Sequence, residues 1–187
     1  QELTAWRLTE ADRRFRRAVA LDSTFALAHY RLALTRGWIS GADDSVGHAA
    51  IQRATRFADR LPPRDRAMVE AYRLFLDQNF DGARAAYHAL LTADSTDADA
   101  WYGLGDLNFH DPDKTHLGEH HTESLRAFKR AIALDPGYYL AYEHLEAIYR
   151  LASLDQPALA LLPGDSLVRP EAPPLTAAGA IWTTAGA

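Results

Sequence analysis

A cluster of histidine and acidic residues at positions 110–121 is the part of the sequence best suited to chemistry. Neutral imidazole nitrogens and carboxylate oxygens are ligands that Zn²⁺, Ni²⁺ and Cu²⁺ accept. His116 and His120 are four positions apart, so they would lie on one face if the segment were helical. The cluster therefore supplies these candidate metal ligands: His110, His116, His120 and His121, with Asp111, Asp113 and Glu119 beside them.

The same cluster has a second interpretation, in which it binds no metal. Its spacing matches no known metal-binding motif. It also falls in a segment that we expect to be a loop between two helices. A solvated histidine-rich loop, or a helix start at His121 or Thr122, explains the same residues.

Sequence signatures of an enzyme are missing from the chain. There is no glycine loop for phosphate, no G-x-S-x-G and no H-E-x-x-H. There is also no cysteine, which excludes disulfides and thiolate metal sites. The numerous acidic pairs fit solvated helix surfaces or turns. We therefore expect a non-catalytic protein without a cofactor.

Composition narrows the classes of partner. The 187 residues are 48% hydrophobic and 24% charged, which is ordinary for a folded chain. The net charge of −5 gives no reason to expect binding to nucleic acid or to an anionic membrane. No apolar run approaches the length of a membrane span, so we expect no direct membrane insertion. Residue 1 is Gln rather than an initiator Met, so we expect residues upstream, and cytoplasm and periplasm both stay open.

Apolar residues recur at helical spacing along most of the chain. The pattern predicts helices over residues 4–22, 25–38, 45–60 and 62–76, another between the turns at 77–80 and 92–95, and two within 97–136. A further helix starts near residue 138, and a short one is expected at 157–162. Asp44 or Ser45 is expected to cap the third helix, and Pro62 and Pro63 begin the fourth, because proline fits a first turn.

Residues 101–136 show that these helices form repeats. The stretch opens with Trp101, Leu104 and Gly105, and its second half has Phe128 and Pro136. This order resembles one tetratricopeptide repeat (TPR), a 34-residue helix–turn–helix unit with the pattern W-x2-L-G-x2-Y…A-x3-F…P. The resemblance extends over about residues 4–162, and such regions occur in bacterial proteins.

The repeat endings support the resemblance, and some positions depart from it. Asp22 and Asp94 end two units and lie 72 residues apart, which is two periods of 36. The next ending, Asp135, comes 41 residues later, because about seven residues are inserted between the two helices of that unit. Asn108 replaces the tyrosine of the pattern and Ser124 replaces its alanine.

The resemblance implies an all-α, right-handed superhelical solenoid. Residues 1–162 would form it, with about three full repeats and partial repeats at each end, and residues 163–187 would be an extended tail or linker rich in Pro, Ala and Gly. In such a solenoid the first helix of each repeat lines a concave groove. By register, the groove residues are Tyr30, Leu34, Trp38, Met68, Tyr72, Phe75, Tyr102, Asp106, Phe109 and Glu143.

This set favours protein–protein interaction as the function. Its aromatic residues are typical anchors for a peptide or helix, and its acidic end would suit basic residues in the partner. The competing interpretation is that half of the aromatics pack against neighbouring helices. An uncapped last repeat would expose apolar surface, which the chain's own tail or another subunit could cover.

Two other functions stay open at this stage. Ala-Leu-Asp repeat ends and the Leu-Pro-Pro-Arg-Asp helix start are similar to TPR regions of bacterial Ser/Thr kinases, adenylate cyclases and transcription regulators. The chain could therefore be the regulatory or sensor region of such a signalling protein. A metal-binding protein acting through the histidine-rich insertion is the more distant alternative.

Overall fold

The computed structural model describes residues 8–111 and 119–154, with side chains described at 8–111 and 122–150. The predicted short helix at 157–162 and the tail at 163–187 lie outside these residues, as do His116 and the side chains of His120 and His121. No helix of the described part is both long and apolar enough to cross a membrane.

The described part of the chain contains only helices and their connections, so the predicted all-α fold is confirmed. In chain order the α-helices are α1 (Leu8–Leu21), α2 (Ala26–Ser40), α3 (Ser45–Arg56), α4 (Pro63–Leu76), α5 (Phe80–Ala93), α6 (Ala98–His110), α7 (Glu119–Leu134) and α8 (Tyr139–Leu154). A short 3-10 helix, η1 (Ala58–Arg60), precedes α4.

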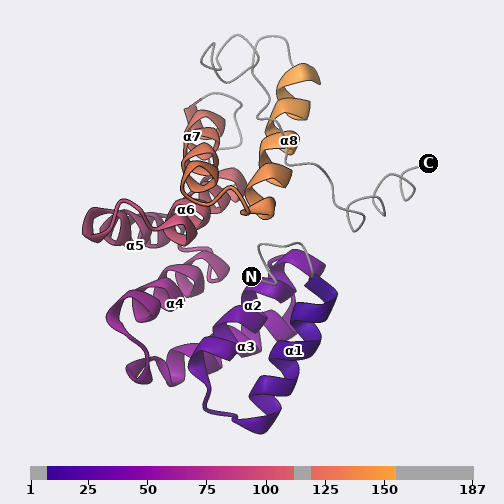
Figure 1. Cartoon of the computed structure of the whole chain (residues 1–187), viewed down its shortest axis with the longest axis vertical. Helices are drawn as coiled ribbons and strands as arrows, with labels where there is room; N and C mark the ends of the chain where they lie inside the picture. Colours follow the sequence, from indigo (N-terminus) through magenta and orange to yellow (C-terminus); the bar gives the residue numbers. More distant parts are fainter. Residues whose placement is uncertain (1–7, 112–118, 155–187) are drawn as a thin grey trace, which may run out of the picture.

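The helices pack as hairpins stacked one on the next. The most extensive contacts join α2 with α3, α4 with α5, and α6 with α7. Between hairpins, α3 contacts α4, and α5 contacts α6, while α1 packs on α2 and α8 on α7. The stack runs from α1–α3 at one end to α6–α8 at the other (Figure 1). This is a TPR-like solenoid.

Local sequence sets where these helices begin. The Asp44 carboxylate accepts hydrogen bonds from the amides of Val46 and Gly47 at 3.2 and 3.1 Å, which caps α3 as predicted. Asn79 caps α5 by accepting a hydrogen bond from the Gly82 amide at 3.1 Å. Helix α4 begins at Pro63, where the absent N–H removes no helical hydrogen bond.

The turns that end two repeats are built alike, although they lie far apart in sequence. The carboxylate of Asp22 accepts hydrogen bonds from the amide and hydroxyl of Thr24, at 2.8 and 2.7 Å. The carboxylate of Asp94 does the same with Thr96, at 2.8 and 2.6 Å. The Asp at each repeat end thus closes the turn that leads into the next hairpin.

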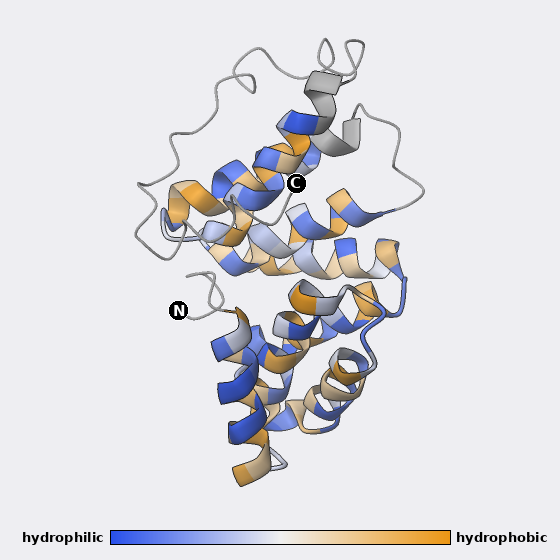
Figure 2. Cartoon of the chain, turned by 90° about the vertical axis from the view of Figure 1, so that its right-hand side faces the viewer, coloured by the Kyte–Doolittle hydropathy of each residue, from blue (hydrophilic) through white to orange (hydrophobic). Residues whose placement is uncertain are grey.

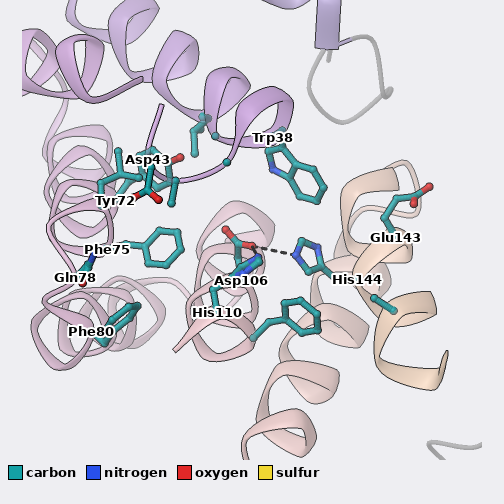
Figure 3. Close-up of a pocket in the computed structure, with 17 residues that line it drawn as sticks. Trp38, Asp43, Tyr72, Phe75, Gln78, Phe80, Asp106, His110, Glu143 and His144 are labelled. Atoms are coloured by element: carbon teal, nitrogen blue, oxygen red, sulfur yellow. Dashed lines mark ion pairs between the residues drawn. The ribbon is translucent and has the colours of Figure 1, made fainter. Parts of the chain in front are cut away.

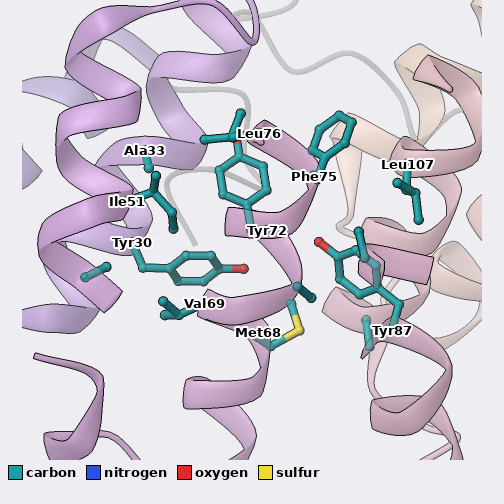
Figure 4. Packing of buried hydrophobic residues seen from close by; sticks show 14 of the residues in the cluster. Tyr30, Ala33, Ile51, Met68, Val69, Tyr72, Phe75, Leu76, Tyr87 and Leu107 are labelled. Atoms are coloured by element: carbon teal, nitrogen blue, oxygen red, sulfur yellow. The ribbon is translucent and has the colours of Figure 1, made fainter. Parts of the chain in front are cut away.

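Small residues on α6 allow close approach of its neighbours. A Cβ at Gly105 would lie 2.7 Å from the Phe128 ring on α7, and one at Gly103 would overlap the Tyr87 ring on α5. Phe128 and Tyr87 are buried. Figure 4 shows the adjoining core, where Tyr87 and Tyr72 lie among buried apolar side chains. The helices carry both polar and apolar residues (Figure 2), as expected when each helix buries one face and exposes the other.

Two boundaries differ from the sequence-based expectation. Helix α3 ends at Arg56 instead of continuing to residue 60, because the chain turns through η1 before Pro62. Helix α7 begins at Glu119, so His120 and His121 belong to a helix and not to the inter-helix loop.

Candidate functional site

A cavity of about 590 Å³ lies along the first helices of successive hairpins. Its wall comes from α2 and the loop after it, from α4 and the start of α5, from the C-terminal half of α6, and from α8. The residues that line it are Leu34, Gly37, Trp38, Gly41, Ala42, Asp43, Tyr72, Phe75, Leu76, Gln78, Phe80, Asp106, Phe109, His110, Glu143, His144 and Ala147. The side chains labelled in Figure 3 surround this space and come from α2, α4, α5, α6, α8 and the loops after α2 and α4.

The structure brings most of the predicted groove residues to this one cavity. Those that line it are Leu34, Trp38, Tyr72, Phe75, Asp106, Phe109 and Glu143. The remaining three, Tyr30, Met68 and Tyr102, line a smaller cavity of about 30 Å³ together with Leu34, Trp38, Tyr72 and Asp106. The repeat register therefore places side chains from three hairpins and from α8 on one side of the stack.

The predicted groove residues differ in how accessible they are. Tyr30, Met68, Tyr72, Phe75 and Tyr102 are buried in the core. Burial raises the pKa of both Tyr72 and Tyr102. A second group is partly or fully exposed and can meet a ligand directly: Leu34, Trp38, Asp106, Phe109 and Glu143.

Asp106 stands between two histidines at the floor of the cavity. Its Oδ1 lies 3.1 Å from Nε2 of His144 on α8 and 3.4 Å from Nε2 of His110, one helical turn along α6. Figure 3 shows the contact from the carboxylate to the His144 ring as a dashed line, with the His110 ring close to the same carboxylate. The three potential ligand atoms lie within 4.8 Å of one another. These three residues could hold a metal ion.

The imidazole of His144 is fixed in orientation. Its Nδ1 donates a hydrogen bond to the carbonyl oxygen of Leu140 at 3.1 Å. Its ring is stacked on Phe128 at 4.6 Å between centroids and meets the edges of Trp38 and Phe109 at 4.9 and 5.0 Å. Nε2 is therefore held toward Asp106 before any ligand arrives.

Burial and hydrogen bonding shift the pKa values of three ionisable residues that line the cavity. Burial alone would raise the pKa of Asp106, but hydrogen bonds from His110 and His144 outweigh it, so the pKa lies below its usual value. Burial also opposes the protonated form of His110, yet its hydrogen bond to Asp106 raises the pKa of that histidine. The pKa of Glu143 is raised by burial and by the nearby Glu146.

A second polar network joins the lining helices at the smaller cavity, where Arg31, Asp99 and Tyr138 form part of the wall. Arg64 on α4 donates hydrogen bonds to Asp97 and Asp99, at 2.7 and 2.9 Å. The hydroxyl of Tyr138, which precedes α8, donates a hydrogen bond to the Asp99 carboxylate at 2.9 Å. Nη2 of Arg31 on α2 lies 3.4 Å from the same carboxylate. Burial by itself would raise the pKa of Asp99, but the two arginines outweigh it, so the pKa of Asp99 lies below its usual value. One carboxylate thus links four elements.

The sequence-based metal candidates are not gathered in the described part. Among these candidates the side chains of His110 and Asp111 are described. His110 has Asp106 and His144 as neighbours, whereas Asp111 accepts a hydrogen bond from Arg84 at 2.6 Å. His144 was missed because only the folding of α8 against α6 brings it near. A local signal existed for the other two residues, since Asp106 and His110 are spaced by four on one helix.

Comparisons with known proteins add little about function. No family model and no curated protein matches the chain. Among solved structures, a crystal structure of MamA aligns over 86% of this chain and 87% of its own, with 17% sequence identity and a TM-score of 0.43. A second MamA structure covers 86% and 81%, with 18% identity and a TM-score of 0.42. A likeness at this level carries no functional information.

Proposed function

We propose that this protein is a non-catalytic interaction module that binds a peptide segment of a partner protein in the 590 Å³ cavity. One observation carries the proposal: side chains from α2, α4, α6 and α8 converge on a single open space. Its volume falls in the range of specific ligand pockets, about 300–1,000 Å³. Because several hairpins contribute, an extended or helical segment can contact more than one repeat at once.

The lining indicates what such a segment carries. Accessible apolar surface comes from Leu34, Trp38 and Phe109, which can contact one or two large apolar side chains. The acidic residues Asp43 and Glu143 line the cavity at opposite edges. We infer a partner segment with an aromatic or aliphatic anchor and basic residues beside it, since opposite charges across an interface favour association.

A peptide selection with matched variants tests this proposal. Short random peptides are displayed and selected on the wild-type chain, and the affinity of recovered peptides is measured for the Phe109→Ala, Glu143→Lys and Glu123→Lys variants. Glu123 provides the control, because it is exposed like Glu143 but lies on α7 and does not line the cavity.

The expected outcome separates the three variants. Recovered peptides should combine apolar anchors with Lys or Arg. Phe109→Ala should weaken their binding about tenfold or more, as truncation of an anchor contact does. Glu143→Lys should weaken binding more at low than at high salt, while Glu123→Lys leaves it unchanged. Peptides that bind all four proteins equally would show that the cavity is not the binding site.

A further inference from the structure

The strongest unassigned feature of the molecule is the group of Asp106, His110 and His144 at the cavity floor. These residues come from two helices, and their potential ligand atoms lie within 4.8 Å of one another. The carboxylate oxygen lies 3.1 and 3.4 Å from the two imidazole nitrogens. For bonds of about 2.0–2.1 Å at tetrahedral angles, neighbouring zinc ligands stand roughly 3.3 Å apart. The two distances to the carboxylate oxygen match that value closely.

The hydrogen bonding of His144 indicates that a positive charge belongs between its Nε2 and the Asp106 carboxylate. Its Nδ1 carries the hydrogen that is donated to the Leu140 carbonyl. In the neutral ring, Nε2 then presents a lone pair to Asp106, whose oxygen is also an acceptor, at 3.1 Å. Two acceptors at this distance repel unless a cation joins them. A proton can do so, and a divalent metal ion can take its place.

The surroundings of the three residues have features that are common around metal ions in proteins. Metal-binding histidines usually donate their other ring N–H to a carbonyl or carboxylate, which orients the ring, and His144 does this with Leu140. Packing against Phe128 and Trp38 prevents the ring from turning away. All three candidate ligands also line the open cavity.

We propose that Asp106, His110 and His144 bind one Zn²⁺ ion at the floor of the cavity. Two imidazoles and one carboxylate favour a transition metal of this class over Mg²⁺ or Ca²⁺, which prefer oxygen ligands throughout. Three protein ligands leave a fourth position open toward the cavity, where water or a donor atom of a bound molecule completes the coordination.

Isothermal titration of the full chain with ZnCl₂ tests the site directly, with MgCl₂ as the comparison. The informative variants are His110→Ala and Asp106→Asn. The His110 side chain is 51% exposed, so its removal leaves the core intact, and Asn reproduces the shape of Asp. Circular dichroism verifies that both variants stay helical. Two controls follow: His88→Ala, at an exposed position on α5, and a triple replacement of His116, His120 and His121 by Ala.

The expected result is one Zn²⁺ per chain, no heat with Mg²⁺, and a loss of affinity of at least about tenfold in both informative variants. The two controls should bind as the wild type does. Absence of heat with Zn²⁺ overturns the proposal. So does binding that persists in His110→Ala and Asp106→Asn but is lost in the triple variant, which would place the metal on the insertion. The peptide selection does not depend on either result.

Discussion

Replacing Gly105 by Ala tests the packing that brings the two halves of the candidate site together. Gly105 lies in the middle of α6, which carries Asp106 and His110. At an exposed helical position this change would stabilise the protein by about 1 kcal/mol, because Ala is the better helix former. Here the added methyl group would lie 2.7 Å from Phe128, about 0.7 Å closer than ordinary van der Waals contact at 3.4 Å.

The expected net effect is a loss of stability. The Phe128 ring is fully buried, so it has no free space into which to retreat. Overpacking of a dense core costs about 1–3 kcal/mol, and a clash with a confined ring belongs in the upper half of that range. After the helix-propensity gain is subtracted, Gly105→Ala should destabilise the protein by about 1–2 kcal/mol. The melting temperature should fall by roughly 2–8 °C.

A double-mutant cycle with Phe128→Leu isolates the cause. The smaller, branched side chain of Leu makes room for the new methyl group. In the Phe128→Leu background, Gly105→Ala should therefore be neutral or stabilise by up to about 1 kcal/mol. Urea unfolding followed by circular dichroism measures all four proteins. Equal losses in both backgrounds, or no loss in the wild-type background, would refute the reasoning.

Two further predictions concern the charged contacts that fix the lining helices. Asp44→Asn keeps an N-cap for α3 but removes the ion pair with Arg36, whose Nη2 lies 2.7 Å from the carboxylate. The substitution should lower the free energy of unfolding by about 1–2 kcal/mol, measured by urea unfolding at pH 7. The hydrogen bond from Arg36 lowers the folded-state pKa of Asp44. Its contribution to stability is therefore fully present above the unfolded pKa of about 3.9 and is lost progressively as the pH falls from there through the lower folded-state pKa. The difference in free energy of unfolding between the wild type and Asp44→Asn should shrink over the same pH range, and an undiminished difference at pH 3 would contradict this cause. Asp99→Asn turns an amide toward Arg64 and should lower the free energy of unfolding by about 2 kcal/mol, whereas an unchanged urea midpoint would show that this network does not hold the hairpins together.

The sequence alone determined the helices and the register of the repeats. Helix periodicity, the cap at Asp44 and the prolines before α4 act within a few residues, so their effects can be deduced without a fold. Once a period is known, equivalent positions of successive hairpins must point to the same side. That is why Leu34, Tyr72 and Asp106, one from each of three hairpins, were expected together and line one cavity.

Only the tertiary structure decided which of these residues are accessible and what meets between helices. Register places both Tyr30 and Phe109 among the groove positions, yet packing against neighbouring helices buries the first and leaves the second partly exposed. The approach of His144 to Asp106, across 38 positions of sequence, depends on how α8 docks against α6 and α7. Such contacts arise from the shapes of side chains far apart in the chain, and no local pattern encodes them.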